Sequence, residues 1–284
     1  MIDKIFVTGA GGLLGNYLVR LAPEFAPNTA EIVGLTRSQL DLLDFAAVRE
    51  EFHRQNPKAI IHCAALSRSP ECEANPGLAR KLNVEVTRLL ADLAANIPFV
   101  FFSSDLVFDG RAGNYDESAA VNPLSVYGET KLEAERIVLA NPKHTVVRTS
   151  LNGGTSLTGD RAFNEQLRRS WQAGRSVTLF TDEFRSPIFA GLTARAVWEL
   201  LAARRTGLYH VAGSERLSRL QIGQLLASRW PRLNPKIEPA SSKDHSGPRR
   251  PPDCSLNCRK ANALLSFPLP GLTQWLHGHP AESF

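Results

Sequence analysis

A glycine-rich segment at residues 8–15 constrains the fold more than any other feature of this chain of 284 residues. It follows the apolar run 5–7, which predicts a strand, and it precedes leucines spaced as one face of a helix. A strand, a glycine turn and a helix in this order predict a dinucleotide site, with the helix N-terminus directed at the phosphates. Alone, the pattern is weak evidence, because ordinary strand-to-helix turns also contain glycine. The candidate cofactor-binding residues of this turn are Gly9, Gly11, Gly12, Leu13 and Leu14.

A second motif, more than a hundred residues later, sharpens this prediction. Tyr127 and Lys131 lie four positions apart, so on a helix they share one face. We expect the ammonium, helped by an oxidised nicotinamide, to lower the pKa of Tyr127 toward working pH, so that the pair can transfer a proton. Ser104 and Asp105 follow the apolar run 99–102, at the strand end where open α/β sheets bind ligands. For the Tyr–Lys pair alone, a surface helix pair is the alternative. The glycine turn and the strand-end serine favour catalysis.

The end of the second predicted strand indicates the cofactor. NAD-selective sites commonly place an acidic residue there, about twenty residues past the glycines. Arg37 and Ser38 stand at this place and offer a guanidinium and a hydroxyl to a 2′-phosphate. We therefore expect NADP(H) rather than NAD(H). A solvated loop is the alternative interpretation of Arg37.

Apolar runs that predict strands alternate with helical stretches along the chain, at residues 5–7, 32–35, 59–63, 99–102, 145–147 and 208–211. This alternation predicts an α/β fold with a doubly wound parallel sheet of the Rossmann type. We expect an NADP-binding Rossmann domain at residues 1–150, to which 188–213 return as a helix and a strand. A smaller C-terminal substrate lobe takes residues 151–187 and 214–284.

The charge of the chain does not require a nucleic acid. The net charge is +5 and the isoelectric point about 9.2, but the basic residues are scattered and no nucleic-acid motif accompanies them. We expect no nucleic-acid partner, since anionic small molecules explain the balance. The densest basic stretch, residues 243–260, contains Arg249 and Arg250. These arginines either face a nucleotide diphosphate or lie in a solvated loop.

The sequence also suggests a compartment. It shows neither a signal-peptide-like leader nor an apolar run of membrane-spanning length, so we expect a cytoplasmic protein without a membrane partner. Cys63 lies in an apolar strand and Cys72 in a polar loop, whereas Cys254 and Cys258 lack a second pair at zinc-site spacing. We expect free thiols and no metal site.

The chain resembles the extended short-chain dehydrogenase/reductase superfamily over nearly its whole length. Within it, the chain is most similar to the dTDP-4-dehydrorhamnose reductases, and similarly close to the regulatory beta subunit of methionine adenosyltransferase. The resemblance is carried by the glycine turn and by residues 41–44, 62–65, 82–84, 103–110 and 123–133. It implies that Asp41 and Leu42 border the adenine and that Ala64 and Ala65 line the ribose and pyrophosphate. It also implies that Asn83 supports these cofactor-lining residues without contacting the cofactor.

The activity implied by this resemblance is NADPH-dependent reduction of a keto group on a nucleotide-linked sugar. Tyr127 would protonate the carbonyl oxygen, Ser104 would hydrogen-bond it, and Lys131 would hold the nicotinamide ribose. Asp105 would lie at the reaction site, although a strand-end carboxylate equally suits a helix cap. A dehydratase is disfavoured because Leu106, not a second acid, follows Asp105. An epimerase is disfavoured because residues 36–38 do not suit tightly held NAD.

Three positions depart from the reductase pattern, and each loses a ring or a polar group: Leu106, Leu151 and Ala162. A pocket without these groups suits a different sugar or no sugar. A second hypothesis therefore stays open, an NADP-binding regulatory subunit that binds a partner enzyme through its substrate face. Tyr127 and Lys131 do not distinguish the reductase from the regulatory subunit, because the regulatory relative retains both residues. A homodimer is also left open as a possible assembly of this chain.

Overall fold

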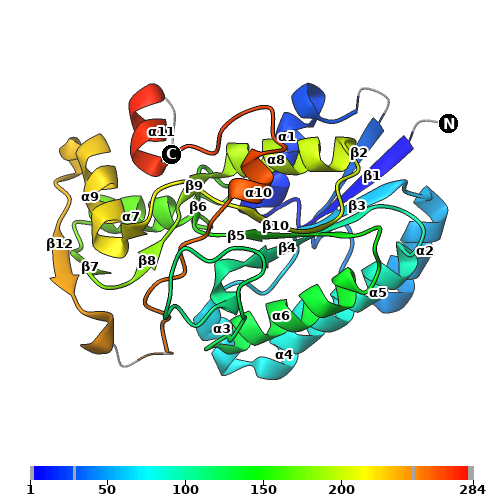
Figure 1. Ribbon diagram of the computed structural model, residues 1–284, viewed down its shortest axis with the longest axis horizontal. Coiled ribbons are helices and arrows are strands. Elements are labelled where there is room, and N and C mark those ends of the chain that lie inside the picture. The colour runs from blue at the N-terminus through cyan, green and yellow to red at the C-terminus, as the bar shows by residue number, and fades with distance from the viewer. Residues whose placement is uncertain (1–2, 28–29, 245–246, 248, 281–284) are drawn as a thin grey trace.

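The computed structural model describes residues 3–27, 30–244, 247 and 249–280. Within them, a central sheet of six parallel strands runs in the order β10-β5-β4-β3-β1-β2 (Figure 1). These strands are β1 (Asp3–Thr8), β2 (Ala30–Leu35), β3 (Ala59–His62), β4 (Phe99–Ser104), β5 (Thr145–Thr149) and β10 (Gly207–Val211). All six correspond to predicted strands, so the predicted α/β fold is confirmed. The strand order reverses between β1 and β3, and ligands of such sheets bind at this switch point.

Helices cover both faces of the sheet (Figure 1). The helices α1 (Leu13–Phe25) and α8 (Ala190–Ala202) lie on one face, and α2 (Phe45–Gln55), α5 (Val86–Leu93) and α6 (Val126–Leu139) lie on the other. Side chains of β4 alternate between the two layers: Val100 packs with the α1 and α8 side, whereas Phe99 and Phe101 pack with the α5 and α6 side. Both faces are buried, which explains why the strands read as continuous apolar runs.

A π-helical turn interrupts the helical stretch that precedes β4. The chain passes through α3 (Ser69–Ala74), α4 (Pro76–Arg80), the π turn Lys81–Glu85 and α5. Such turns widen a helix locally and are frequent near functional sites. The turn carries Asn83, which is buried between this stretch and α6.

A separate hydrophobic cluster lies beside the sheet. It is built by α7 (Phe163–Gln172), α9 (Arg219–Arg229) and α11 (Leu272–Gly278), with the parallel pair of β7 (Val177–Phe180) and β12 (Ile237–Ala240). Trp171, Ile222 and Trp275 are among its buried members. Two short pairs join it to the sheet: β8 (Phe184–Arg185) with β11 (Leu217–Ser218), and β6 (Asn152–Gly153) with β9 (Ile188–Phe189). The helix expected within residues 188–213 thus begins at Ala190, after β9.

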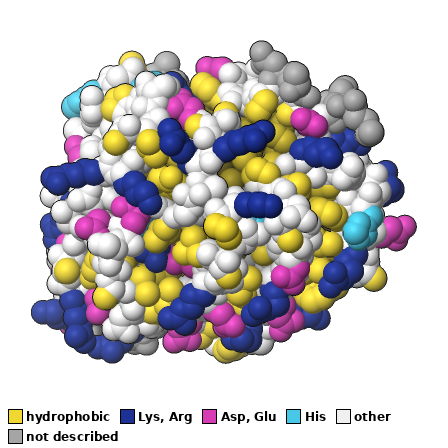
Figure 2. Space-filling view, turned by 45° about the vertical axis from the view of Figure 1, so that its right-hand side comes forward, with side chains coloured by type: hydrophobic (Ala, Val, Ile, Leu, Met, Phe, Trp, Pro, Cys, Tyr) yellow, Lys and Arg dark blue, Asp and Glu magenta, His cyan; other side chains and the backbone are white. Residues whose placement is uncertain are grey.

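The remaining elements are short: the 3-10 turns Asp105–Val107, Pro231–Leu233 and Ser242–Asp244, and α10 (Arg259–Asn262). Within the described ranges, no helix combines the length and apolar character that a membrane span requires. All four cysteines fall in these ranges and are free thiols, and Cys72 is buried in α3 rather than placed in a loop. Lysines and arginines are spread over the face in Figure 2 rather than gathered into one stripe.

Candidate functional site

A cavity of about 830 Å³ opens at the carboxyl ends of the central strands, at the β1–β3 switch point. The predicted site residues that line it are Gly9, Gly11, Gly12, Leu13, Leu14, Arg37, Asp41, Leu42, Ala64, Ala65, Ser104, Tyr127 and Lys131. The predicted residues Ser38, Asp105, Arg249 and Arg250 are described by the structure but lie outside this lining. The fold therefore gathers the glycine turn, the strand-end serine and the Tyr–Lys pair around one space.

The glycine turn packs too tightly for side chains. Gly9 has φ +69°, and a Cβ there would lie 2.7 Å from the backbone nitrogen of Ala64. A Cβ on Gly15 would lie 2.2 Å from the carbonyl oxygen of Gly9. Gly12 is the N-cap of α1. Because glycine has no side chain that could cap the helix, the first backbone amides of α1 remain open toward the cavity. This cradle has the shape and polarity that a pyrophosphate requires.

Asn83 connects the loop after β3 to the helix that carries the Tyr–Lys pair. Its side chain accepts a hydrogen bond from Leu66 N at 2.8 Å and donates to Leu66 O at 3.1 Å. It also donates to Thr130 Oγ1 at 3.0 Å. Thr130 lies on α6 between Tyr127 and Lys131, so Asn83 fixes the cavity loop relative to both.

The loop after β2 presents hydroxyls and a guanidinium. Arg37 and Thr36 line the cavity. The side chain of Ser38 lies outside the lining and pairs with the Thr36 hydroxyl at 3.0 Å. Asp41 accepts from Leu43 N at 3.1 Å, so its carboxylate is engaged by its own turn. Arg37 is thus the cationic side chain that this loop offers.

Burial shifts the pKa values of Tyr127 and Lys131 in the ligand-free protein. Burial raises the pKa of Tyr127, the charge of Asp105 raises it further, and a hydrogen bond with Ser104 opposes the rise. In the ligand-free protein the pKa of Tyr127 is therefore raised; the expected lowering also involves an oxidised nicotinamide, so it stays a prediction for the bound state. Burial also lowers the pKa of Lys131 to about 7, against the opposing charges of Glu135 and the nearby thiols. The Lys131 Nζ lies 4.1 Å from the centroid of the Phe101 ring.

Asp105 lies directly behind the cavity wall. Its Oδ1 accepts from Ser104 Oγ at 3.0 Å, and its Oδ2 accepts from Ser150 Oγ at 2.6 Å. Burial raises its pKa, against the charge of Arg185 and the two hydroxyls. Within the described chain, these contacts hold two serines and cap no helix, which answers the alternative left open by the sequence.

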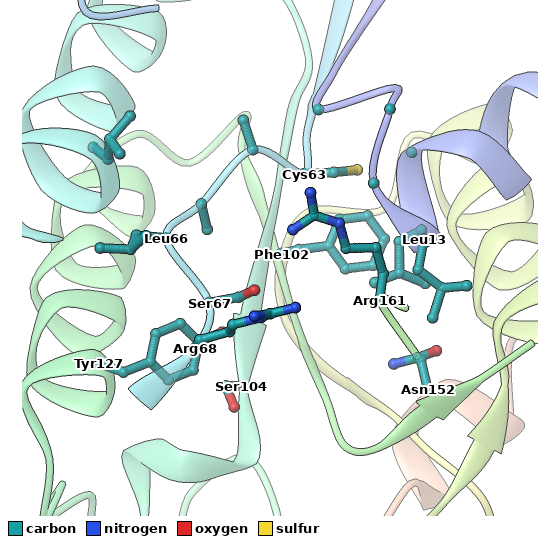
Figure 3. Close-up of a pocket in the computed structure, with 18 of the residues that line it drawn as sticks. Leu13, Cys63, Leu66, Ser67, Arg68, Phe102, Ser104, Tyr127, Asn152 and Arg161 are labelled. Carbon is teal, nitrogen blue, oxygen red and sulfur yellow. The ribbon is translucent and has the colours of Figure 1, made fainter. Parts of the chain in front are cut away.

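The cavity is also lined by polar residues that the sequence did not reveal: Arg68, Ser150, Asn152, Arg161, Gln166 and Arg219. Figure 3 shows Tyr127 extending from α6 toward Ser104, with Asn152 and Arg161 on the far side. These residues come from separate segments and follow no motif, so only the folded chain brings them together.

The basic stretch 243–260 is directed elsewhere. Arg249 is exposed, and Arg250 donates to Glu183 Oε2 at 2.9 Å. Of the three departures from the reductase pattern, Leu151 lines the cavity. Leu106 packs against the core of the central sheet, and Ala162 is buried before α7; both are described and lie outside the lining.

Relatives of this chain include proteins of two kinds. The methionine adenosyltransferase 2 subunit beta of Xenopus tropicalis is 30% identical over 277 residues, 92% of this chain and 82% of that protein. The probable low-salt glycan biosynthesis reductase Agl14 of Haloferax volcanii is 34% identical over 238 residues, 77% of each.

Solved structures show the same fold. A hypothetical dTDP-4-dehydrorhamnose reductase from Sulfolobus tokodaii is 30% identical, has a TM-score of 0.84, and matches over 95% of this chain and 97% of its own. A dTDP-4-dehydrorhamnose reductase from Bacillus anthracis, in complex with NADP, has a TM-score of 0.88 at 23% identity, over 98% of both chains. Residues 3–278 match the RmlD substrate binding domain family. The chain therefore belongs to this family of extended short-chain dehydrogenases/reductases.

Proposed function

We propose that this protein is an NADPH-dependent reductase of a keto group on a nucleotide-linked sugar. The observation that carries the proposal is a single cavity whose walls hold the glycine cradle, Ser104, Tyr127 and Lys131. The likeness to a hypothetical dTDP-4-dehydrorhamnose reductase over almost the whole chain supports the same class.

The cofactor half of the cavity fits a dinucleotide phosphate. The glycine turn and the N-terminus of α1 suit the pyrophosphate, and Arg37 suits a 2′-phosphate. Ala64 and Ala65 would line the ribose, and Asp41 and Leu42 would border the adenine. When bound, NADPH supplies the hydride.

The chain's own residues would handle the proton and the developing charge. The raised pKa of Tyr127 keeps its phenol protonated at neutral pH, so it can donate to the carbonyl oxygen. Ser104 would hydrogen-bond that oxygen, where negative charge develops. Lys131 would hold the nicotinamide ribose. The negative charge of the bound cofactor would favour the protonated form of Lys131. Asp105 would act behind Ser104, since it lies outside the lining of the cavity.

The anionic part of the substrate would face Arg161 and Arg219. Both line the cavity. Guanidinium groups bind phosphate oxygens in a two-pronged geometry. We propose them in place of Arg249 and Arg250, because Arg161 and Arg219 line the cavity, whereas Arg249 and Arg250 lie outside its lining.

The alternative is an NADP-binding regulatory subunit. The relative named methionine adenosyltransferase 2 subunit beta favours it, as does Leu151, which places an apolar side chain in the cavity where the reductase pattern has a ring. This alternative predicts cofactor binding without sugar reduction and a stable complex with a partner enzyme.

NADPH consumption against a panel of nucleotide-linked 4-keto sugars tests the proposal. Calorimetry first establishes that NADPH binds, and Tyr127→Phe serves as the matched variant. We expect oxidation with at least one sugar and its loss in the variant. A bound cofactor with no oxidation across the panel would overturn the reductase in favour of the regulatory subunit.

Two further proposals concern organisation and place. The separate cluster around Trp171 and Trp275 supports a substrate lobe at residues 151–187 and 214–284, beside a Rossmann domain at 1–150 with 188–213. Cys254 and Leu269 pack instead with the core of the central sheet, so we assign residues 254–269 to that domain. Residues 1–2 and 281–284 lie outside the described chain. The free thiols support the proposed cytoplasmic location.

A further inference from the structure

A row of buried charged side chains runs behind the cavity wall, from Asp105 through Arg185 to Glu183. The Arg185 Nε lies 3.7 Å from Asp105 Oδ2, and its Nη2 lies 3.2 Å from Glu183 Oε1. All three side chains are buried. The roles proposed above for the cavity use neither Arg185 nor Glu183, so the row requires its own explanation.

The orientation of Arg185 is set by partners other than Asp105. Its Nη1 donates to the carbonyl oxygens of Phe184 at 2.7 Å and Pro251 at 3.1 Å. The Nη2 of Arg185 contacts Glu183, which is itself paired with Arg250. A guanidinium is planar and stays charged, so it presents a fixed positive charge to Asp105.

Asp105 in turn contacts hydroxyls on two neighbouring strand ends. Ser104 ends β4, and Ser150 follows β5; both line the cavity. Ser150 Oγ also accepts from Ser186 N at 3.2 Å. An ionised carboxylate accepts hydrogen bonds on both oxygens, whereas a protonated one carries a donor on one of them. The ionised form therefore accepts a hydrogen bond from both serines, whereas the protonated form would have to donate to one of them.

We propose that Arg185 is a positioning residue that keeps Asp105 ionised and thereby fixes the side chains of Ser104 and Ser150 in the cavity wall. Burial alone favours the protonated carboxyl. The other charged or titratable groups that influence Asp105 are Glu183, Arg219, Tyr127 and Cys254. Among the described cations, Arg185 is the one in ion-pair contact with Asp105.

The first test needs no substrate. Urea unfolding is measured between pH 4 and pH 8 for the wild type, Arg185→Met, Asp105→Asn and the double variant. Asp105 has a raised pKa when folded, so its share of the stability is present at low pH and is lost as pH rises through that pKa. We expect Arg185→Met to extend this loss to higher pH, and Asp105→Asn to remove it. Arg185→Lys retains the charge and should resemble the wild type.

The same pH dependence in Arg185→Met and in the double variant would overturn the proposal. If Arg185→Met does not fold, the comparison of Arg185→Lys with its own Asp105→Asn double variant decides. In that pair, an Asp105-dependent loss of stability that ends in the same pH range as in the wild type supports the proposed role of the positive charge at position 185. A loss that extends to higher pH than in the wild type contradicts this role.

The second test uses turnover and rests on the proposed reductase function. We expect Arg185→Met to lower kcat by about tenfold or more, while the affinity for NADPH stays within about twofold. In the Asp105→Asn background, the same change should lower kcat by less than about threefold, because the two residues act as one unit. Equal losses in both backgrounds would contradict the proposal.

Arg216→Gln is the matched control. Arg216 precedes β11, which pairs with the strand of Arg185, and its Nε contacts Asp253 at 2.6 Å rather than Asp105. We expect wild-type kcat and wild-type pH dependence. If no keto-sugar is reduced by the wild type, the proposed function fails, but the unfolding experiment still decides the role of Arg185.

Discussion

Arg148 and Glu135 form a buried two-pronged ion pair, with Nε 2.9 Å from Oε1 and Nη2 2.7 Å from Oε2. Arg148 lies on β5, and Glu135 lies on α6, one helical turn beyond Lys131. The pair therefore ties the sheet to the helix that carries Tyr127 and Lys131. The negative charge of Glu135 also opposes the fall in the pKa of Lys131.

Removing Arg148 should destabilise the fold strongly. Arg148→Met leaves Glu135 buried without its partner, a change that typically costs about 3–5 kcal/mol. Urea unfolding at neutral pH measures the loss. The control is Arg54→Met, whose pair with Glu51 is on the surface and should contribute within about 1 kcal/mol. Equal losses for the two variants would show that burial of the Arg148 pair is unimportant.

Lys131 should make stability depend on pH in the ligand-free protein. Its pKa is about 7 when folded, below the ordinary value of 10.5, so between these values the unfolded chain binds a proton that the folded chain does not. The free energy of unfolding should therefore rise with pH in this window, by at most about 1.4 kcal/mol per pH unit from this residue. Lys131→Met should lack this contribution.

The measurement is the difference between the unfolding free energies of wild type and Lys131→Met from pH 7 to pH 10. Burial raises the pKa of Cys63, Cys72 and Tyr127, so these groups titrate within this range only in the unfolded chain, and they are present in both proteins. A difference that stays constant across the range would refute the lowered pKa.

The sequence predicts those parts of the molecule that depend on local pattern. The six strands of the sheet follow from apolar runs, and the glycine turn follows from residues that need φ > 0° or close backbone approach, such as Gly9. The spacing of Tyr127 and Lys131 places both on one face of α6, and both line the cavity.

The remaining features depend on contacts between distant segments. Arg161 and Arg219 reach the same cavity from segments almost sixty residues apart, without a shared motif. The pairing of Arg250 with Glu183 spans a similar distance. The raised pKa of Tyr127 reflects burial, which composition and spacing do not report.

Arg37 should select the cofactor. It lines the cavity at the end of β2, where no acidic side chain stands in residues 36–38. A charge-assisted contact with the 2′-phosphate contributes roughly 1.5–3 kcal/mol, so NADPH should bind about tenfold or more tightly than NADH. Calorimetry with Arg37→Ala should show this preference reduced. Arg49→Ala, an exposed arginine on α2, should leave it unchanged. An unaltered ratio in Arg37→Ala contradicts the assignment.

Substitutions of Tyr127 and of Lys131 should affect turnover and cofactor binding differently. Tyr127→Phe removes the proposed proton donor and should lower turnover by about 10²–10⁴-fold, with cofactor affinity nearly intact. Lys131→Ala should weaken both turnover and cofactor binding, because the ammonium is proposed to contact the ribose. Stopped-flow hydride transfer and calorimetry measure the two quantities. Retention of more than about a tenth of the wild-type rate by Tyr127→Phe is incompatible with a general acid.

Gly9 offers a test of the cradle itself, because Gly174 shares its backbone conformation without its surroundings. The φ values are +69° and +67°, but a Cβ on Gly9 would lie 2.7 Å from Ala64 N, whereas nothing lies within 4 Å of a Cβ on Gly174. Gly174→Ala should therefore lose only about 1–2 kcal/mol for the left-handed conformation and bind NADPH normally.

Gly9→Ala adds a collision with the backbone of the loop that follows β3. That loop lines the cavity at Ala64 and Ala65, so its displacement should destabilise the fold beyond the loss in Gly174→Ala and also reduce NADPH affinity. Urea unfolding and calorimetry on the two variants separate backbone strain from the collision. Because the two positions differ in surroundings and not in φ, equal effects on stability and on affinity would mean that the tight approach of Gly9 to Ala64 does not shape the cradle.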